Sequence, residues 1–101
     1  MPRRAKLEAM LAAAPNDGFL RYSWALELAK SGERGPALDA LRSLATDDPD
    51  GHAACFRLGQ MLHEDGDDDE AARWMDRGIA AARRLGDRKA ADEMEDFRNL
   101  L

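Results

Sequence analysis

The strongest constraint on this chain is a period of 34 residues within its own sequence. The stretch WALELAKSGERGPALDAL, which begins at Trp24, lines up with LGQMLHEDGDDDEAARWM, which begins at Leu58. The residues that recur at this spacing are Pro15 with Pro49, Trp24 with Leu58, Leu28 with Leu62, Gly32 with Gly66, Ala37 with Ala71, and Leu41 with Met75. Such a period is typical of a chain built from stacked units. We expect one domain over residues 1–101, with a half repeat at 3–15, full repeats at 16–49 and 50–85, and a capping helix within 86–101.

Each unit carries the signals of two helices joined by a tight turn. Gly32 and Gly66 follow apolar stretches, and glycine readily takes the left-handed conformation in which helices end. Residues that favour helix starts recur as well, at Asn16 or Asp17, at Gly35 followed by Pro36 in the first helical position, at Asp50, at Asp67 paired with Glu70, and at Asp87. Together with an initial helix at 3–13, these signals predict six helices, the others at about 18–31, 36–46, 51–65, 68–85 and from 88 onward.

With these residues in place, the chain resembles the tetratricopeptide repeat family, whose 34-residue helix-turn-helix unit carries W-x₂-L-G-x₂-Y, then A-x₃-F, then P. In the first full unit the matching residues are Trp24, Ala25, Leu28, Ala37, Leu41 and Pro49, and in the second they are Leu58, Gly59, Leu62, Ala71 and Met75. Arg21 and Cys55 stand where the family has a large residue, and Arg83 replaces the last proline. The resemblance covers about residues 3–85. It implies an all-α fold, a short right-handed solenoid of antiparallel helix pairs.

Packing explains why these residue types recur. The resemblance places Ala25 and Gly59 where two helices approach closely, which requires small side chains. Larger side chains are expected to fill the space between helices, namely Trp24, Leu28, Leu41, Leu58, Leu62 and Met75. A single unit of this kind cannot bury its own apolar face, so the ends of the stack need capping helices.

Composition and charge exclude several classes of protein. The formal net charge is −5, whereas nucleic-acid binders usually show a basic footprint. No apolar run approaches the length of a membrane span. The single cysteine, Cys55, cannot form an internal disulfide, which favours a reducing cytoplasm, and its place in the repeat predicts an inert, buried thiol. We therefore expect a cytoplasmic protein that uses no nucleic acid and no membrane.

The resemblance implies a non-enzymatic scaffold, adaptor or co-chaperone-like module that binds a protein or peptide on the concave surface formed by the first helix of each pair. By helical position this surface would be formed by Phe19, Tyr22, Leu26 and Ala29 from the first unit, and by Ala53, Phe56, Gln60 and His63 from the second, with Arg57 nearby. Residues 18–31 carry two apolar stripes, and only one is needed for the core. The alternative is that the second stripe packs against the first or last helix of the same chain.

The residues at this surface favour an apolar occupant. Relatives that bind a C-terminal carboxylate do so with lysine, arginine and asparagine, and Tyr22 and Leu26 stand in two of those places. An apolar or aromatic peptide, or an amphipathic helix, suits the surface better. Self-assembly is the other hypothesis, in which two apolar grooves or two ends of the stack form a homodimer.

The acidic loop HEDGDDDE at 63–70 does not carry a metal motif. Asp65, Asp67 and Asp69 alternate as in a calcium loop, but Glu70 stands where glycine is required. Helix capping explains these carboxylates without a metal. Neither His52 nor His63 has a nucleophile in phase, and the common catalytic motifs are missing. We therefore expect no catalytic residues, no metal site and no cofactor.

Overall fold

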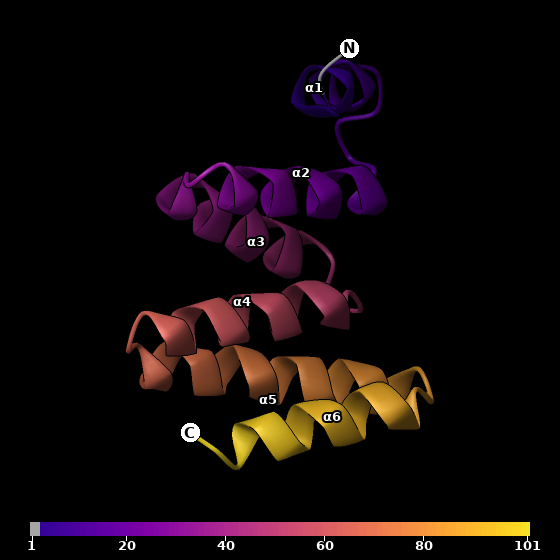
Figure 1. The fold of residues 1–101 in the computed structure, drawn as a ribbon. Helices are drawn as coiled ribbons and strands as arrows, with labels where there is room; N and C mark the ends of the chain where they lie inside the picture. Colours follow the sequence, from indigo (N-terminus) through magenta and orange to yellow (C-terminus); the bar gives the residue numbers. More distant parts are fainter. Residues whose placement is uncertain (1–2) are drawn as a thin grey trace.

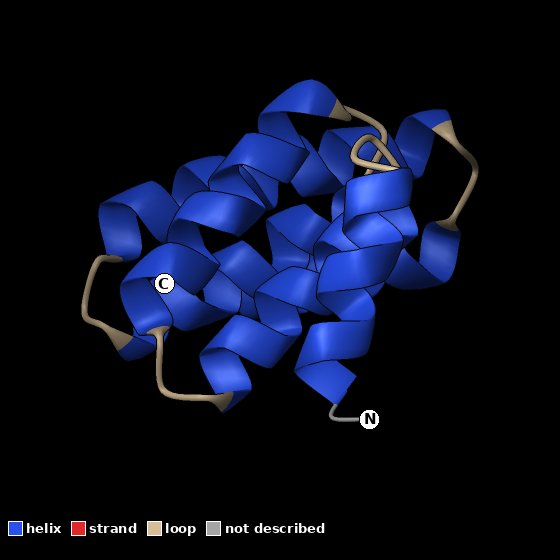
Figure 2. Ribbon diagram, turned by 90° about the horizontal axis from the view of Figure 1, so that it is seen from above, coloured by secondary structure: helices blue, strands red, loops and turns tan. Residues whose placement is uncertain are grey.

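The computed structural model describes residues 3–101 and consists of six helices over that range, with no strands. The helices are α1 (Arg3–Ala13), α2 (Gly18–Lys30), α3 (Arg34–Asp47), α4 (His52–Glu64), α5 (Asp68–Arg84) and α6 (Arg88–Arg98). Each helix contacts the next one along the chain, so the helices stack in chain order and the two ends of the chain lie at opposite ends of the stack (Figure 1). Short loops join them (Figure 2). The predicted all-α solenoid is confirmed.

The glycines predicted to end helices do so in the same way each time. Gly32, Gly66 and Gly86 have φ angles of +82°, +83° and +74°. The residue after each glycine donates its N–H to a carbonyl five residues earlier, at 2.9 Å from Glu33 to Leu28 and at 2.9 Å from Asp67 to Leu62. This Schellman arrangement satisfies carbonyls that the helix itself leaves free. Each of these glycines therefore marks the end of a helix, and the 34-residue spacing of Gly32 and Gly66 is the spacing between two equivalent helix ends.

Aspartates begin three of the helices as expected. The side chains of Asp17, Asp67 and Asp87 each accept a hydrogen bond from the backbone N–H three residues on, at 3.0, 3.3 and 3.1 Å. This bond satisfies one of the N–H groups that have no partner in the first helical turn. The side chain of Glu70 does not complete a capping box with Asp67, because its carboxylate binds Arg42 and Trp74 instead.

Two predicted helix starts are wrong by one or two residues. α3 begins at Arg34, so Pro36 is its third residue rather than its first. The shift is tolerated because the N–H groups of the first turn have no helical partner, and a proline there loses nothing. α4 follows Gly51 as its N-cap, and the carboxylate of Asp50 instead accepts a hydrogen bond from Arg84 at 3.0 Å.

The core lies between successive helices and follows the repeat. The apolar residues predicted to fill it are buried at Leu28, Leu41, Leu58, Leu62 and Met75. Trp24 is the exception, because it is only half-buried and its ring lies under the Arg4 guanidinium, 5.3 Å from the ring centroid. Trp24 therefore holds α1 against α2, at the edge of the core. Ion pairs of Arg3 with Glu27 and of Arg4 with Glu33 support the same contact.

Glycines inside helices mark the closest helix contacts. A Cβ atom placed on Gly59 would lie 2.6 Å from Cε of Met75 and 3.4 Å from the carbonyl oxygen of Ala71. This confirms the expected close approach of α4 and α5. Gly78 makes a second close contact that the sequence did not indicate, since a Cβ there would lie 2.7 Å from Sδ of Met94.

The last helix follows the pattern of α4 after two extra residues. Its buried residues Ala91 and Met94 stand 36 positions after Cys55 and Leu58, two of the buried residues of α4. α5 has 17 residues where α3 has 14, and the loop after α5 is one residue shorter than the loop after α3, which together give the two extra residues. α5 continues through Arg83, at the place where a proline would stop it. Ala91 and Met94 of α6 pack on Met75, Ile79 and Ala82 of α5.

Candidate functional site

A hollow lies between α2 and α4 on the face of the stack that the first helices of the pairs form. Its volume is about 340 Å³, and it is lined by Tyr22, Leu26, Ala53, Phe56, Arg57 and Gln60. All six belong to the surface predicted from the repeat. The side chains of Tyr22, Leu26 and Phe56 are half-buried and form its apolar part.

The hollow continues at both ends. Toward the start of α2 it shares Tyr22 and Ala53 with an apolar hollow of about 210 Å³, which adds Phe19 and Leu44. Toward the end of α2 it shares Leu26 and Arg57 with a hollow of about 370 Å³, whose other lining residues are Ala29, Lys30, Arg34, Met61 and Glu64. We call this continuous surface, from Phe19 to Lys30 on α2 and from Ala53 to Glu64 on α4, the α2–α4 groove.

The repeat itself aligns the side chains of the groove. Tyr22 and Phe56 are 34 residues apart, as are Leu26 and Gln60, so equivalent turns of α2 and α4 place them side by side. On α2 the residues Leu20, Ala25 and Leu28 are buried in the core, which leaves Tyr22 and Leu26 for the groove. Phe19, at the start of α2, is 77% exposed.

His63 is the predicted site residue that does not line the groove. Its ring meets the ring of Phe97 on α6 edge-on, with centroids 5.6 Å apart, and its Nδ1 lies 2.7 Å from Oδ1 of Asp68. Phe97 also packs against Phe56, with centroids 6.1 Å apart and an interplanar angle of 68°. The last helix thus covers one edge of Phe56. The hollow bordered by Tyr22 and Leu26 stays open.

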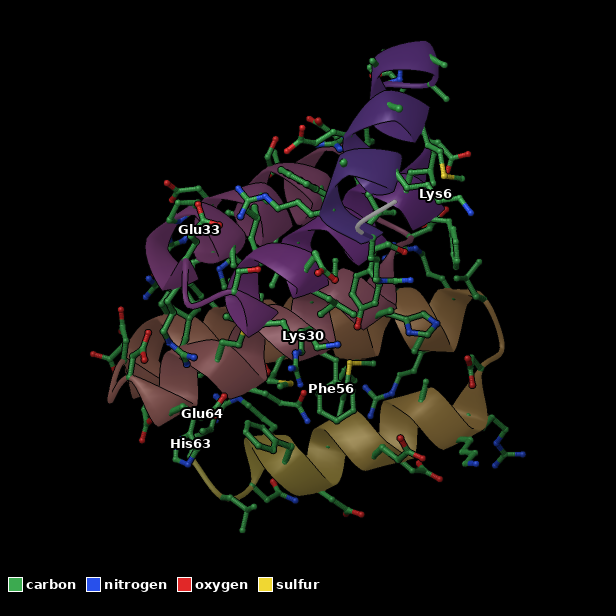
Figure 3. The ribbon with its side chains drawn as sticks, turned by 45° about the horizontal axis from the view of Figure 1, so that its top comes forward. Lys6, Lys30, Glu33, Phe56, His63 and Glu64 are labelled. Carbon is green, nitrogen blue, oxygen red and sulfur yellow. The ribbon has the colours of Figure 1, made fainter. Side chains whose placement is uncertain are left out.

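The groove contains two basic residues that were not predicted, Lys30 and Arg34, beside Arg57, which was. The guanidinium of Arg34 is held by Asp65 at 2.7 Å, by Glu64 at 3.6 Å and by the carbonyl oxygen of Met61 at 2.9 Å. Lys30 and Arg57 are exposed, and within residues 3–101 neither forms an ion pair. In Figure 3, Lys30 and Phe56 lie on the same side of the molecule. Lys30 follows Leu26 by four residues, which is the signal that places it on the groove face.

The carboxylates of the acidic loop cap a helix or pair with neighbouring side chains, and the cysteine is buried. Asp67 caps α5, Asp65 pairs with Arg34, and Asp68 lies against His63. Cys55 is only 2% exposed, and burial raises the pKa of its thiol, which favours the unreactive protonated form. None of the described helices is both long enough and apolar enough to span a bilayer.

Comparison with known proteins identifies the family. No family model and no curated protein matches the chain. Among solved structures, it is similar to the solution structure of a tetratricopeptide repeat domain protein from Salinibacter ruber, with 31% identity, a TM-score of 0.79, and coverage of 83% of this chain and 85% of that one. A crystal structure of a tetratricopeptide repeat domain protein from the same organism gives 30% identity and a TM-score of 0.75, over 81% of this chain and 91% of that one.

A third similar structure is the solution structure of a Bordetella parapertussis protein, with 30% identity and a TM-score of 0.78, over 98% of this chain and 86% of that one. These likenesses extend over most of the stack, and they agree with the 34-residue period and with its glycine helix ends. The chain therefore belongs to the tetratricopeptide repeat family.

Proposed function

We propose that this chain is a non-enzymatic protein-interaction module that binds an apolar or aromatic segment of a partner protein in the α2–α4 groove. The family points to protein interaction in general. The observation that carries the specific proposal is the open hollow of about 340 Å³ between Tyr22, Leu26 and Phe56. We place the module in the cytoplasm, where a lone buried thiol such as Cys55 stays reduced.

The chemistry of the groove supports an extended peptide or an amphipathic helix as the occupant. Aromatic side chains that are half-buried before binding lose little conformational freedom when a partner covers them, and they tend to carry most of the interface energy. Tyr22 also offers a hydroxyl, and Gln60 an amide, to fix the register of a bound backbone. The hollows follow the direction of two helices, which suits an elongated ligand.

The surroundings of the histidines and the cysteine favour binding over catalysis. His52 pairs with Asp87 at 3.3 Å, and His63 is held by Asp68 and Phe97. Cys55 is buried against Gly78 of α5 and is not among the residues that line the groove. The histidines therefore contact the first residues of neighbouring helices, and the cysteine is part of the core. The groove itself is lined by apolar side chains that a partner could cover.

The test uses peptides selected against the wild-type domain from a displayed library, followed by affinity measurements on variants. Tyr22→Ala should weaken the selected peptides about 30-fold, which corresponds to roughly 2 kcal/mol for an aromatic anchor. Leu85→Ala is the matched control, because Leu85 is exposed at the end of α5, away from the groove. Thermal melts and sedimentation velocity on the same samples separate a binding defect from unfolding or self-association. Unchanged affinity in Tyr22→Ala would contradict the proposal.

A further inference from the structure

The groove carries positive charge at one end, although the chain as a whole is acidic. The net charge is −5, yet Lys30, Arg34 and Arg57 gather where α2 ends. Arg34 is neutralised by Asp65 and Glu64, so the charges left available there belong to Lys30 and Arg57. The hollow at the other end of the groove is almost entirely apolar. The groove is therefore polarised along its length.

Helix stability explains only part of this arrangement. Lys30 lies in the last turn of α2, where a cation interacts favourably with the helix dipole. Arg57 lies in the middle of α4, where the dipole offers no such benefit. Several other arginines of the chain, though not all, meet carboxylates across helices, as Arg21 does with Asp47 and Arg98 with Asp76, both at 3.0 Å. Arg57 lines the hollows on either side of it without such a partner among the described residues.

Building on the proposed function, we propose that the partner segment is acidic as well as apolar: its apolar side chains fill the hollow between Tyr22 and Phe56, and its aspartate or glutamate side chains pair with Arg57 and Lys30. Carboxylates along an internal stretch of the partner satisfy both cations, which lie on different helices. The hollow at the other end of the groove is apolar and has no cation among its lining residues. The acidic part of the segment therefore lies over the C-terminal end of α2 and the middle of α4, which fixes the direction of binding.

The size of the charge effect is measurable. Ion pairs at the rim of an interface act mainly on the association rate and on specificity, and salt screens them. Where the apolar part of the ligand excludes water from the pair, the charge-assisted hydrogen bonds of Arg57 become stronger. We expect an affinity change of about tenfold for reversal of one groove charge, which is larger than that for most exposed pairs.

The experiment compares three fluorescein-labelled helical peptides of about 16 residues. They share one stripe of leucine and phenylalanine, and their remaining positions are all glutamate, all glutamine or all lysine. Fluorescence anisotropy with the wild-type protein should rank the glutamate peptide first. That ranking runs against the net charge of −5, which favours the lysine peptide everywhere else on the surface.

Charge-reversal variants locate the effect. Arg57→Glu and Lys30→Glu should each weaken the glutamate peptide about tenfold, reduce its salt dependence and leave the glutamine peptide unchanged. Arg73→Glu is the control, because Arg73 is exposed on α5 and changes the net charge by the same amount. Thermal melts verify that each variant is folded.

The outcomes separate the inference from the function on which it rests. Equal binding of the glutamate and glutamine peptides, with both weakened by Tyr22→Ala, would refute the acidic preference and leave the groove as a binding site. Tightest binding of the lysine peptide would also refute it. Failure of all three peptides to bind would count against the groove itself. If Arg57→Glu alone dissociates the free protein in sedimentation velocity, the occupant is a second copy of this chain, and the inference of a separate acidic partner is wrong.

Discussion

The carboxylate of Glu70 on α5 joins α5 to α3. It accepts hydrogen bonds from Nε and Nη2 of Arg42 on α3, at 2.8 and 2.9 Å, and from Nε1 of Trp74 on α5, at 2.9 Å. The bonds from Arg42 above all, with that from Trp74, lower the pKa of Glu70 from 4.5 to about 2. Because the charged form is the one that is bound, this carboxylate stabilises the fold only while it is ionised.

Acid should remove the contribution of Glu70 in a defined range. Its folded pKa lies below its unfolded value, so its stabilisation is fully present above about pH 4.5 and is lost as the pH falls toward 2. Glu70→Gln should lower the melting temperature at pH 7, and the gap to the wild type should close by pH 2. Glu93→Gln, at an exposed site on α6, is the control and should show little gap at any pH. A gap for Glu70→Gln that stays constant from pH 7 to pH 2 would show that the ion pair is unimportant.

Gly59 tests the closest helix contact. A side chain at this position meets Met75 and the backbone of Ala71, and only the methionine can move aside. Gly59→Leu should therefore lower the free energy of unfolding by about 1–3 kcal/mol, even though leucine favours helix more than glycine does. Gly35→Ala is the control, because no atom lies within 4 Å of a Cβ there, and it should raise stability by up to about 1 kcal/mol. Urea denaturation of both variants gives the comparison. A stabilised Gly59→Leu would contradict the packing described for α4 and α5.

At the scale of the helices, the sequence predicts ends better than starts. A positive φ is demanding enough that glycine at 32, 66 and 86 locates three helix ends without ambiguity. The start of α4 is less determined, because Asp48, Asp50 and Gly51 are all acceptable caps and Arg84, far along the chain, takes the carboxylate of Asp50. The half-buried position of Trp24 depends in the same way on Arg4 from another helix. Local signals carry no information about such distant partners.

The packing of α6 against α5 gives a further stability prediction. Met94 is fully buried and lies against the close contact at Gly78, so Met94→Ala should cost about 2–5 kcal/mol. Leu100→Ala should change stability by less than about 0.5 kcal/mol, because Leu100 is 74% exposed. We expect one cooperative transition for Met94→Ala, shifted to lower temperature. If Met94→Ala instead keeps the main transition of the wild type and only adds a small early transition, α6 unfolds separately and is not part of the cooperative core.

For the whole molecule, the 34-residue period was enough to predict which face of the helix stack carries the groove. Eight of the nine predicted groove residues line it. The contact of α6 with Phe56 and His63 was not predictable, because α5 is longer than α3 and shifts the last helix out of the 34-residue register. Which cations of the groove remain available also depends on ion pairs between helices, such as Arg34 with Asp65. The role of the predicted residues in binding remains a proposal.

The central claim, that the α2–α4 groove receives a partner segment, is tested most directly by a titration of the ¹⁵N-labelled protein with the tightest-binding of the three helical peptides, followed in ¹H–¹⁵N correlation spectra. We expect saturable shifts whose largest values fall on the amides of Tyr22, Leu26, Phe56 and Gln60, with little change in α1 and on the exposed face of α5. Shifts that are largest in α1, α3 or α5, or spectra that do not change at all, would contradict the claim.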